Sequence, residues 1–122
     1  MQLLRVAIAV SKEQEMLRFY NQVFKAELQP LPTEAGTFYH GQIGQLALTF
    51  VPNSLAQVEA TQNRHQLSFL VSDIKAVIAD AADAGGQQVG ELNIGSEGTI
   101  GAVSDPDGNT IELFESKTAP GA

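Results

Sequence analysis

The sequence has no cysteine. This absence excludes disulfide bonds, thiolate nucleophiles and metal sites built from thiolates, and it fits a protein of a reducing compartment. The sequence also lacks any apolar run near the roughly 20 residues of a membrane span. No basic stretch followed by an apolar one marks a signal peptide at its start. We therefore expect a cytoplasmic protein that does not interact with a membrane.

Basic residues are also scarce. Seven lysines and arginines stand singly against 14 aspartates and glutamates, which gives a formal net charge of −7. Without a basic patch the chain cannot neutralise a phosphate backbone, so we expect no nucleic-acid partner. The sequence likewise has no phosphate-binding glycine loop and no pair of histidines spaced to bind a metal from one helix.

The length and composition are those of one compact domain, with 122 residues of which 43% are hydrophobic. Apolar residues recur with the periods of strands and of helices. Ser11 and Gln14 form a predicted capping box for the first helix, and Ser72 or Asp73 is the predicted cap of the second. The predicted elements are a strand at 3–10, a helix at 12–24, strands at 26–31, 37–40 and 45–51, a short helix within 54–60, a strand at 66–71, a helix that stops before 85–86, and strands at 88–92, 99–103 and 110–114.

Two short motifs recur. Val10-Ser11 reappears 61 residues later as Val71-Ser72, and Leu46-Ala47-Leu48 matches Ile111-Glu112-Leu113, 65 residues later, in position more than in identity. Each half has the order strand, helix, strand, strand, strand, and each half is too short to bury much surface alone. The repeat therefore predicts an α+β fold of a single domain, 1–122, built from modules 3–52 and 65–116 that a connector at 53–64 joins.

On the first and last predicted strand of each half, one face carries large aliphatic residues and the other carries small or polar ones. The face with small or polar residues has two possible roles: it lines a ligand cleft, or it is the solvated side of the sheet. Its residues are Arg5, Ala7 and Ala9, then Gln45, Ala47 and Thr49, then Gln66 and Ser68, and finally Thr110 and Glu112.

The last hairpin carries the most specific motif of the chain. Pro106 and Gly108 predict a tight turn, in which Asp105 and Asp107 hydrogen-bond nearby backbone groups. After the turn, residues 111 and 113 are apolar and face the core. Glu112 therefore faces the opposite way, onto a surface that is solvated, paired or functional.

Three segments, together with the repeat, span residues 3–116 and resemble one protein family. They are Arg5 to Val10 with Phe19-Tyr20, Gln66 to Asp73 with Ala84-Gly85-Gly86, and the hairpin from Asp105 to Glu115. They resemble the vicinal oxygen chelate superfamily, which includes glyoxalase I, fosfomycin- and bleomycin-resistance proteins, methylmalonyl-CoA epimerase and extradiol dioxygenases. The resemblance implies two tandem βαβββ modules that form a curved mixed sheet around a cleft, and a homodimer.

The resemblance also implies four ligand positions, on the first and last strand of each module, where metal-using members hold a divalent ion. These positions fall on Arg5, Ala47, Gln66 and Glu112. An arginine has no lone pair for a metal and an alanine has no donor atom. Gln66 and Glu112 fall short of the usual three protein ligands, so we expect no metal cofactor. The alternative is a divalent metal held by Gln66 and Glu112 with a histidine or with water.

We predict that Arg5 takes the place of the metal. Its guanidinium would pair with Glu112, either as a structural pair or to hold an anionic or carbonyl group of a small ligand. In the second case Glu112 is the catalytic residue, which orients the ligand or accepts a proton. His40 is either a ligand-binding or a structural histidine, and Phe114 is either a cleft wall or a subunit contact. The predicted ligand-binding residues are Arg5, His40, Ala47, Gln66, Glu112 and Phe114.

The resemblance, with these departures from it, thus implies a glyoxalase/bleomycin-resistance-like protein that binds a small anionic or carbonyl-containing molecule in its cleft without a conventional metal site. One alternative is a divalent-metal-dependent lyase, isomerase or dioxygenase of the same superfamily. Another is an interaction module with no small ligand. The sequence leaves open whether the protein is an enzyme.

Overall fold

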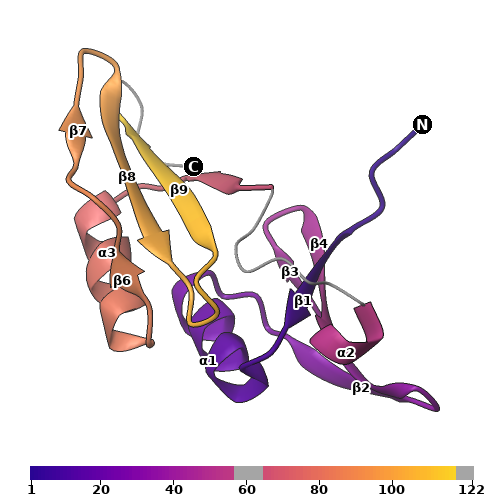
Figure 1. The fold of residues 1–122 in the computed structure, drawn as a ribbon. Helices are drawn as coiled ribbons and strands as arrows, with labels where there is room; N and C mark the ends of the chain where they lie inside the picture. Colours follow the sequence, from indigo (N-terminus) through magenta and orange to yellow (C-terminus); the bar gives the residue numbers. More distant parts are fainter. Residues whose placement is uncertain (57–64, 118–122) are drawn as a thin grey trace. The chain divides into compact units, whose positions relative to one another are not determined.

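The computed structural model describes residues 1–56 and 65–117. The chain divides into two compact units, residues 1–59 and residues 60–122, and each is described by itself. Each unit contains one mixed β-sheet and a crossover helix (Figure 1). This arrangement confirms the predicted α+β fold, and it shows two mixed sheets. No helix in the described part of the chain is both long and apolar enough to cross a membrane.

The first unit has a four-stranded sheet with the order β1-β4-β3-β2. β1 runs parallel to β4, and the other neighbours are antiparallel. The predicted order of strand, helix and three strands is confirmed. Of the short helix predicted within 54–60, the structure describes residues up to 56, which belong to the four-residue helix α2. The remainder of 54–60 lies outside the described residues. The elements are β1 Val6–Val10, α1 Glu13–Val23, β2 Gln29–Thr33, β3 Gly36–Ile43, β4 Leu46–Pro52 and α2 Asn53–Ala56.

Helix α1 packs on its sheet through aromatic side chains. The rings of Tyr20 and Phe50 meet edge to face, with centroids 5.2 Å apart, and both side chains are fully buried. Burying a large apolar side chain stabilises a fold by about 1.5–3 kcal/mol. Along the helix, Met16, Phe19 and Tyr20 are buried, and Leu17, Val23 and Phe24 are half-buried.

The predicted capping box at the start of α1 is wrong. The N-cap residue is Lys12, and no side chain caps the helix there. Lys12 has φ −97° and ψ 71°, which is not helical backbone, so the helix begins one residue later than a Ser11 cap requires. The helix instead places Glu13 where its Oε1 accepts a 2.8 Å hydrogen bond from the Tyr39 hydroxyl on β3.

The strands between α1 and β4 differ from prediction at their ends. β2 starts three residues later than expected. It includes two prolines, which an edge strand tolerates because its outer side has no neighbouring strand to receive hydrogen bonds. β3 continues through Gly41, beyond the strand end predicted at residue 40. A side chain at Gly41 would collide with the carbonyl oxygen of Ala26, so this glycine allows close packing within a strand and does not mark a turn.

The second unit repeats the same plan. Its sheet has the order β5-β9-β8-β6, β7 also pairs with β8, and β5 runs parallel to β9. The predicted single strand at 88–92 is wrong: two short strands flank a loop in which Gly90 has φ +70°. The elements are β5 Leu67–Leu70, α3 Ile74–Asp83, β6 Gln87–Gln88, β7 Asn93–Ile94, β8 Gly98–Ser104 and β9 Thr110–Ser116.

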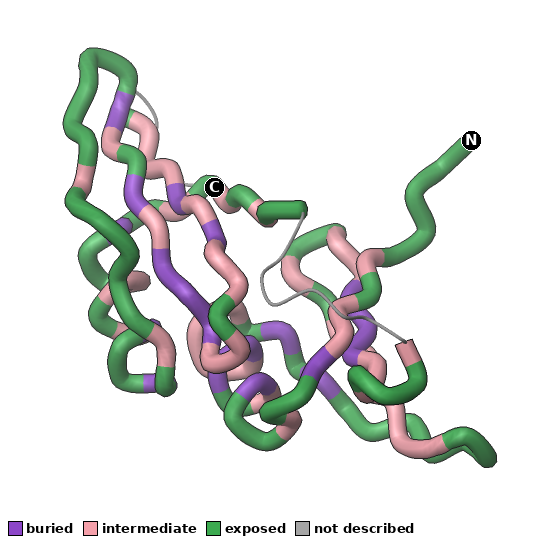
Figure 2. The backbone as a smooth tube through the Cα atoms, viewed as in Figure 1, coloured by how far each residue is buried: buried purple, intermediate pink, exposed green. Residues whose placement is uncertain are grey.

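Helix α3 lies against one face of this sheet, next to β6 and β8 (Figure 1). Asp73 is its N-cap, as predicted, and accepts a 3.1 Å hydrogen bond from the backbone N–H of Ala76. Residues 110–114 of β9 alternate between half-buried and buried (Figure 2), with Ile111 and Leu113 buried as predicted and Glu112 on the opposite face.

The turn between β8 and β9 is organised by Asp105. This carboxylate is 3% exposed and accepts hydrogen bonds from the backbone N–H groups of Asp107 and Asn109, at 3.0 and 2.9 Å, and from the Asn109 amide, at 2.8 Å. The predicted structural role of Asp105 is therefore confirmed.

Candidate ligand-binding site

The first unit contains a small open pocket of about 270 Å³. It lies where the segment before β1 meets β3 and β4. Three of the residues predicted to bind ligand, Arg5, His40 and Ala47, line it together. The complete lining is Leu4, Arg5, His40, Gly41, Ala47, Leu48 and Thr49.

A hydrogen bond fixes the histidine of this pocket. His40 and Thr49 are cross-strand partners on β3 and β4, and His40 Nδ1 lies 2.8 Å from Thr49 Oγ1. Thr49 is 4% exposed, whereas His40 is half-buried. The sequence did not single out Thr49 as a site residue. The signal that could have found it is its two-residue spacing from Ala47, which places both side chains on one face.

Arg5 supplies positive charge to the pocket. It lies directly before β1, on the face of Ala7, and is exposed. β1 is shorter than predicted, since the segment before Val6 is not in the sheet. Ala47 contributes only a methyl group, and Leu4 adds further apolar surface. The pocket therefore combines a guanidinium, an imidazole and a hydroxyl with apolar walls.

The other predicted site residues, Gln66, Glu112 and Phe114, belong to the second unit. The half-buried Glu112 accepts a 3.1 Å hydrogen bond from the Ser68 hydroxyl through its Oε1. Ser68, and not Gln66, is the β5 partner of Glu112 in the sheet. Gln66 is exposed and precedes β5. The pairing of Arg5 with Glu112 stays a prediction from the sequence.

The neighbour of Glu112 follows from a difference in register between the two sheets. In the first unit Val6 pairs with Leu48. In the repeat, Leu67 corresponds to Val6, and Leu113 corresponds to Leu48. Leu67 nevertheless pairs with Ile111, two residues before Leu113. An even shift keeps every side chain on its face but changes which residues lie side by side. The repeat in the sequence could not reveal this shift.

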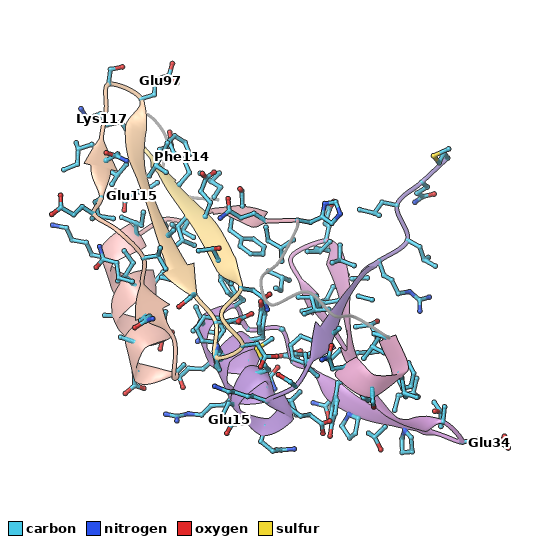
Figure 3. The ribbon with its side chains drawn as sticks, in the orientation of Figure 1. Glu15, Glu34, Glu97, Phe114, Glu115 and Lys117 are labelled. Carbon is cyan, nitrogen blue, oxygen red and sulfur yellow. The ribbon has the colours of Figure 1, made fainter. Side chains whose placement is uncertain are left out.

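Phe114 has a structural contact of its own. It shares a face of β9 with Glu112 and is half-buried, and Glu115 leaves the strand on the opposite face (Figure 3). The ring of Phe114 lies so close to Gly98 that a Cβ atom there would approach the ring to 2.8 Å. An aromatic ring over a glycine of a neighbouring strand protects the exposed backbone of a sheet.

The side chains near these positions do not form a conventional metal site within either unit. The first-unit pocket offers one imidazole, whose Nδ1 already bonds Thr49, and the second unit offers the Glu112 carboxylate beside a hydroxyl. No group of three or more histidines and carboxylates that could hold a metal occurs among residues 1–56 and 65–117. A catalytic divalent metal needs about three such ligands and one open position, so the donor set of each unit by itself does not fit one.

Solved structures with the same fold support this description. A glyoxalase-related enzyme from Fulvimarina pelagi is 18% identical, with a TM-score of 0.76 and coverage of 99% of this chain and 95% of its own. TnmS3, an antibiotic binding protein from Streptomyces sp. CB03234, is 22% identical, with a TM-score of 0.68 and coverage of 96% and 97%. The fosfomycin resistance protein FosX from Mesorhizobium loti is 14% identical, with a TM-score of 0.71 and coverage of 96% and 93%. At these identities the likeness shows the fold.

Comparison with curated protein sequences gives no match. The family model of the glyoxalase-like domain matches residues 5–114, most of the chain. The chain therefore belongs to the glyoxalase-like domain family, within the vicinal oxygen chelate superfamily.

Proposed function

We propose that the protein binds a small molecule with an anionic or carbonyl group, without a conventional metal site, and that the first-unit pocket holds that group. One observation carries this proposal: Arg5 and the hydrogen-bonded His40 line the same pocket, beside apolar walls. A guanidinium and an imidazole bind oxyanions and carbonyl oxygens, and the apolar surface accommodates the rest of a ligand.

Two proteins of the same fold suggest compounds with which this proposal can be tested. One is an antibiotic binding protein and another is a fosfomycin resistance protein. Fosfomycin, a small phosphonate, is therefore a useful probe, and pyruvate tests a carboxylate next to a carbonyl group. Neither compound has to be the natural ligand for the pocket chemistry to be measured.

The test is isothermal titration of fosfomycin and pyruvate into the wild-type protein and into Arg5→Ala. We expect at least one probe to bind, and we expect Arg5→Ala to weaken that binding about tenfold or more, because a charge-assisted hydrogen bond is lost. Arg18→Ala removes the same charge from the exposed side of α1, outside the pocket. Equal affinity in Arg5→Ala and Arg18→Ala would contradict the proposal.

A second candidate function is a divalent-metal-dependent lyase, isomerase or dioxygenase. The half-buried Glu112 carboxylate, on the face of β9 away from the core, favours it. Protein purified without chelator would be analysed for metal and titrated with Ni²⁺, Mn²⁺, Zn²⁺ and Fe²⁺. Tight stoichiometric metal that is lost in Glu112→Gln would replace the first proposal with this one. We expect weak binding that Glu112→Gln does not change.

The family resemblance also underlies a proposed homodimer in the cytoplasm. Light scattering on protein eluting from a sizing column measures the mass directly. A mass of twice 13.0 kDa over a tenfold range of concentration supports the dimer, and a mass of one chain refutes it.

A further inference from the structure

The hydroxyl of Thr49 has a single hydrogen-bond partner among the residues that the structure describes. That partner is His40 Nδ1, at 2.8 Å. Thr49 is 4% exposed, so little water reaches its side chain. A buried hydroxyl proton without an acceptor is unfavourable, because it loses its bond to water and gains none in return. The proton of Thr49 therefore has one good position, on the line to Nδ1.

This position determines which tautomer the neutral imidazole adopts. If Nδ1 accepts the proton of the threonine hydroxyl, the neutral ring carries its own hydrogen on Nε2. The opposite arrangement, in which Nδ1–H donates to Thr49, leaves the buried hydroxyl proton without an acceptor. The geometry thus favours the tautomer in which Nε2–H is a donor and Nδ1 is an acceptor.

The surroundings of the ring agree with a donor at Nε2. Arg5 is the charged side chain that lines the pocket. The sheet neighbours of His40 are the uncharged Gln29 on β2 and Thr49 on β4. The carboxylate of Glu13 bonds Tyr39, whose side chain leaves β3 on the opposite face. The residues that line the pocket therefore include two groups that can donate to an oxyanion, the Arg5 guanidinium and, in this tautomer, the His40 Nε2–H.

We propose that Thr49 is a positioning residue, which holds His40 as an Nε2–H donor and so makes the pocket selective for carboxylates and other oxyanions over neutral compounds of the same shape. This inference rests on the proposed function of the pocket and adds its ligand class. The threonine does not touch the ligand in this scheme. It acts by fixing the ring and its hydrogen.

The first test is spectroscopic. Two-bond ¹H–¹⁵N correlation spectra distinguish the two ring nitrogens of a histidine, and the chain has only two histidines. His65 is exposed and belongs to the other unit, so it serves as the internal reference. At a pH where the ring is neutral, we expect His40 to carry its hydrogen on Nε2. We expect Thr49→Val to produce a mixture of tautomers and Thr49→Ser to retain the Nε2–H form. A hydrogen on Nδ1 in the wild type would overturn the inference.

The second test is selectivity. Benzoate and benzamide share a ring and differ in charge, so we titrate both into the wild type, Thr49→Val and Thr49→Ser. We expect the wild type to prefer benzoate at least tenfold, Thr49→Val to lose about three- to tenfold in benzoate affinity, and Thr49→Ser to stay within about twofold. Thermal unfolding of each variant checks that it is folded.

The outcomes separate this inference from the proposed function. Equal affinity of the wild type for benzoate and benzamide overturns the selectivity but agrees with small-molecule binding in the pocket. Unchanged benzoate affinity in Thr49→Val overturns the role of the threonine alone. No binding of benzoate, benzamide, fosfomycin or pyruvate by the wild type overturns both the inference and the proposed function.

Discussion

Glu115 Oε1 accepts a 2.7 Å hydrogen bond from the backbone N–H of Ile74. This contact joins β9 to the first turn of α3, on the face of the strand opposite Phe114 (Figure 3). A carboxylate at a helix N-terminus satisfies a donor that the helix itself leaves free and interacts favourably with the helix dipole. From the sequence alone, Glu115 is only the last residue of the predicted hairpin from Asp105 to Glu115.

Glu115→Ala is expected to lower the free energy of unfolding by about 1–2 kcal/mol, because the backbone N–H of Ile74, a buried residue, loses its hydrogen-bond partner. Glu115→Gln is expected to cost less, since an amide oxygen still accepts the bond. Urea denaturation followed by circular dichroism measures both. The control is Glu97→Ala, in the exposed segment before β8. A cost at Glu97 equal to that at Glu115 would contradict the capping role.

Tyr39 predicts a loss of stability at alkaline pH. Its hydrogen bond to Glu13 raises the pKa of the phenol above the ordinary 10.0, and burial and the negative charge of Glu13 act in the same direction. The folded protein therefore binds the phenol proton more tightly than the unfolded chain. This contribution to stability is complete below pH 10.0 and is lost as the pH rises through the folded pKa.

Tyr39→Phe is expected to cost about 0.5–1 kcal/mol at neutral pH, a modest value because the side chain is only half-buried. The variant should also lose less stability than the wild type between pH 9 and pH 11, a range that spans the reference value of about 10. Denaturant unfolding at several pH values compares the two proteins. Parallel pH profiles would show that the hydrogen bond to Glu13 does not link folding to the phenol proton.

Asp105 is expected to be the least replaceable residue of the last hairpin. Asp105→Ala removes three hydrogen bonds from a buried turn and should destabilise the fold by about 2–4 kcal/mol. Asp105→Asn keeps one carbonyl oxygen as an acceptor and should cost roughly half as much. Thermal unfolding ranks the two variants. An asparagine variant as unstable as the alanine variant would show that the charge, and not the number of acceptors, stabilises the turn.

Gly41 and Gly101 occupy equivalent places in the two sheets, opposite Leu48 and Leu113. A Cβ atom at Gly41 collides with the carbonyl oxygen of Ala26, which is backbone. At Gly101 the nearest atom is the end of a leucine side chain, at 2.5 Å.

Because a side chain can rotate away and backbone cannot, Gly41→Ala should destabilise the protein by about 2 kcal/mol or more, and Gly101→Ala by clearly less. Chemical denaturation under identical conditions measures the difference. A larger cost at Gly101 would contradict the model of close backbone approach at Gly41. The carbonyl oxygen of Ala26 also accepts a 2.9 Å hydrogen bond from the N–H of Gln42, which holds it in place.

Local chemistry and periodicity predicted much of this fold. The order of strands and helices, the cap at Asp73, the turn built on Asp105 and the outward direction of Glu112 all depend on residues near one another in the chain. The errors lie where a distant segment decides. Gly41 stays in a strand because Ala26 packs against it. The strand expected at 88–92 is replaced by β6 and β7 on either side of a loop, because each pairs with a different stretch of β8.

The candidate site also has features that the sequence predicts and features that only the structure reveals. The sequence by itself determined the chemistry available, with an arginine and an alanine where metal ligands are expected, because these are properties of single side chains. Only the tertiary structure brought His40 against Thr49 and placed Ser68, not Gln66, beside Glu112. Pairing between strands is set by the packing of a whole sheet. A two-residue shift leaves the pattern of faces in the sequence unchanged while giving each side chain a new neighbour.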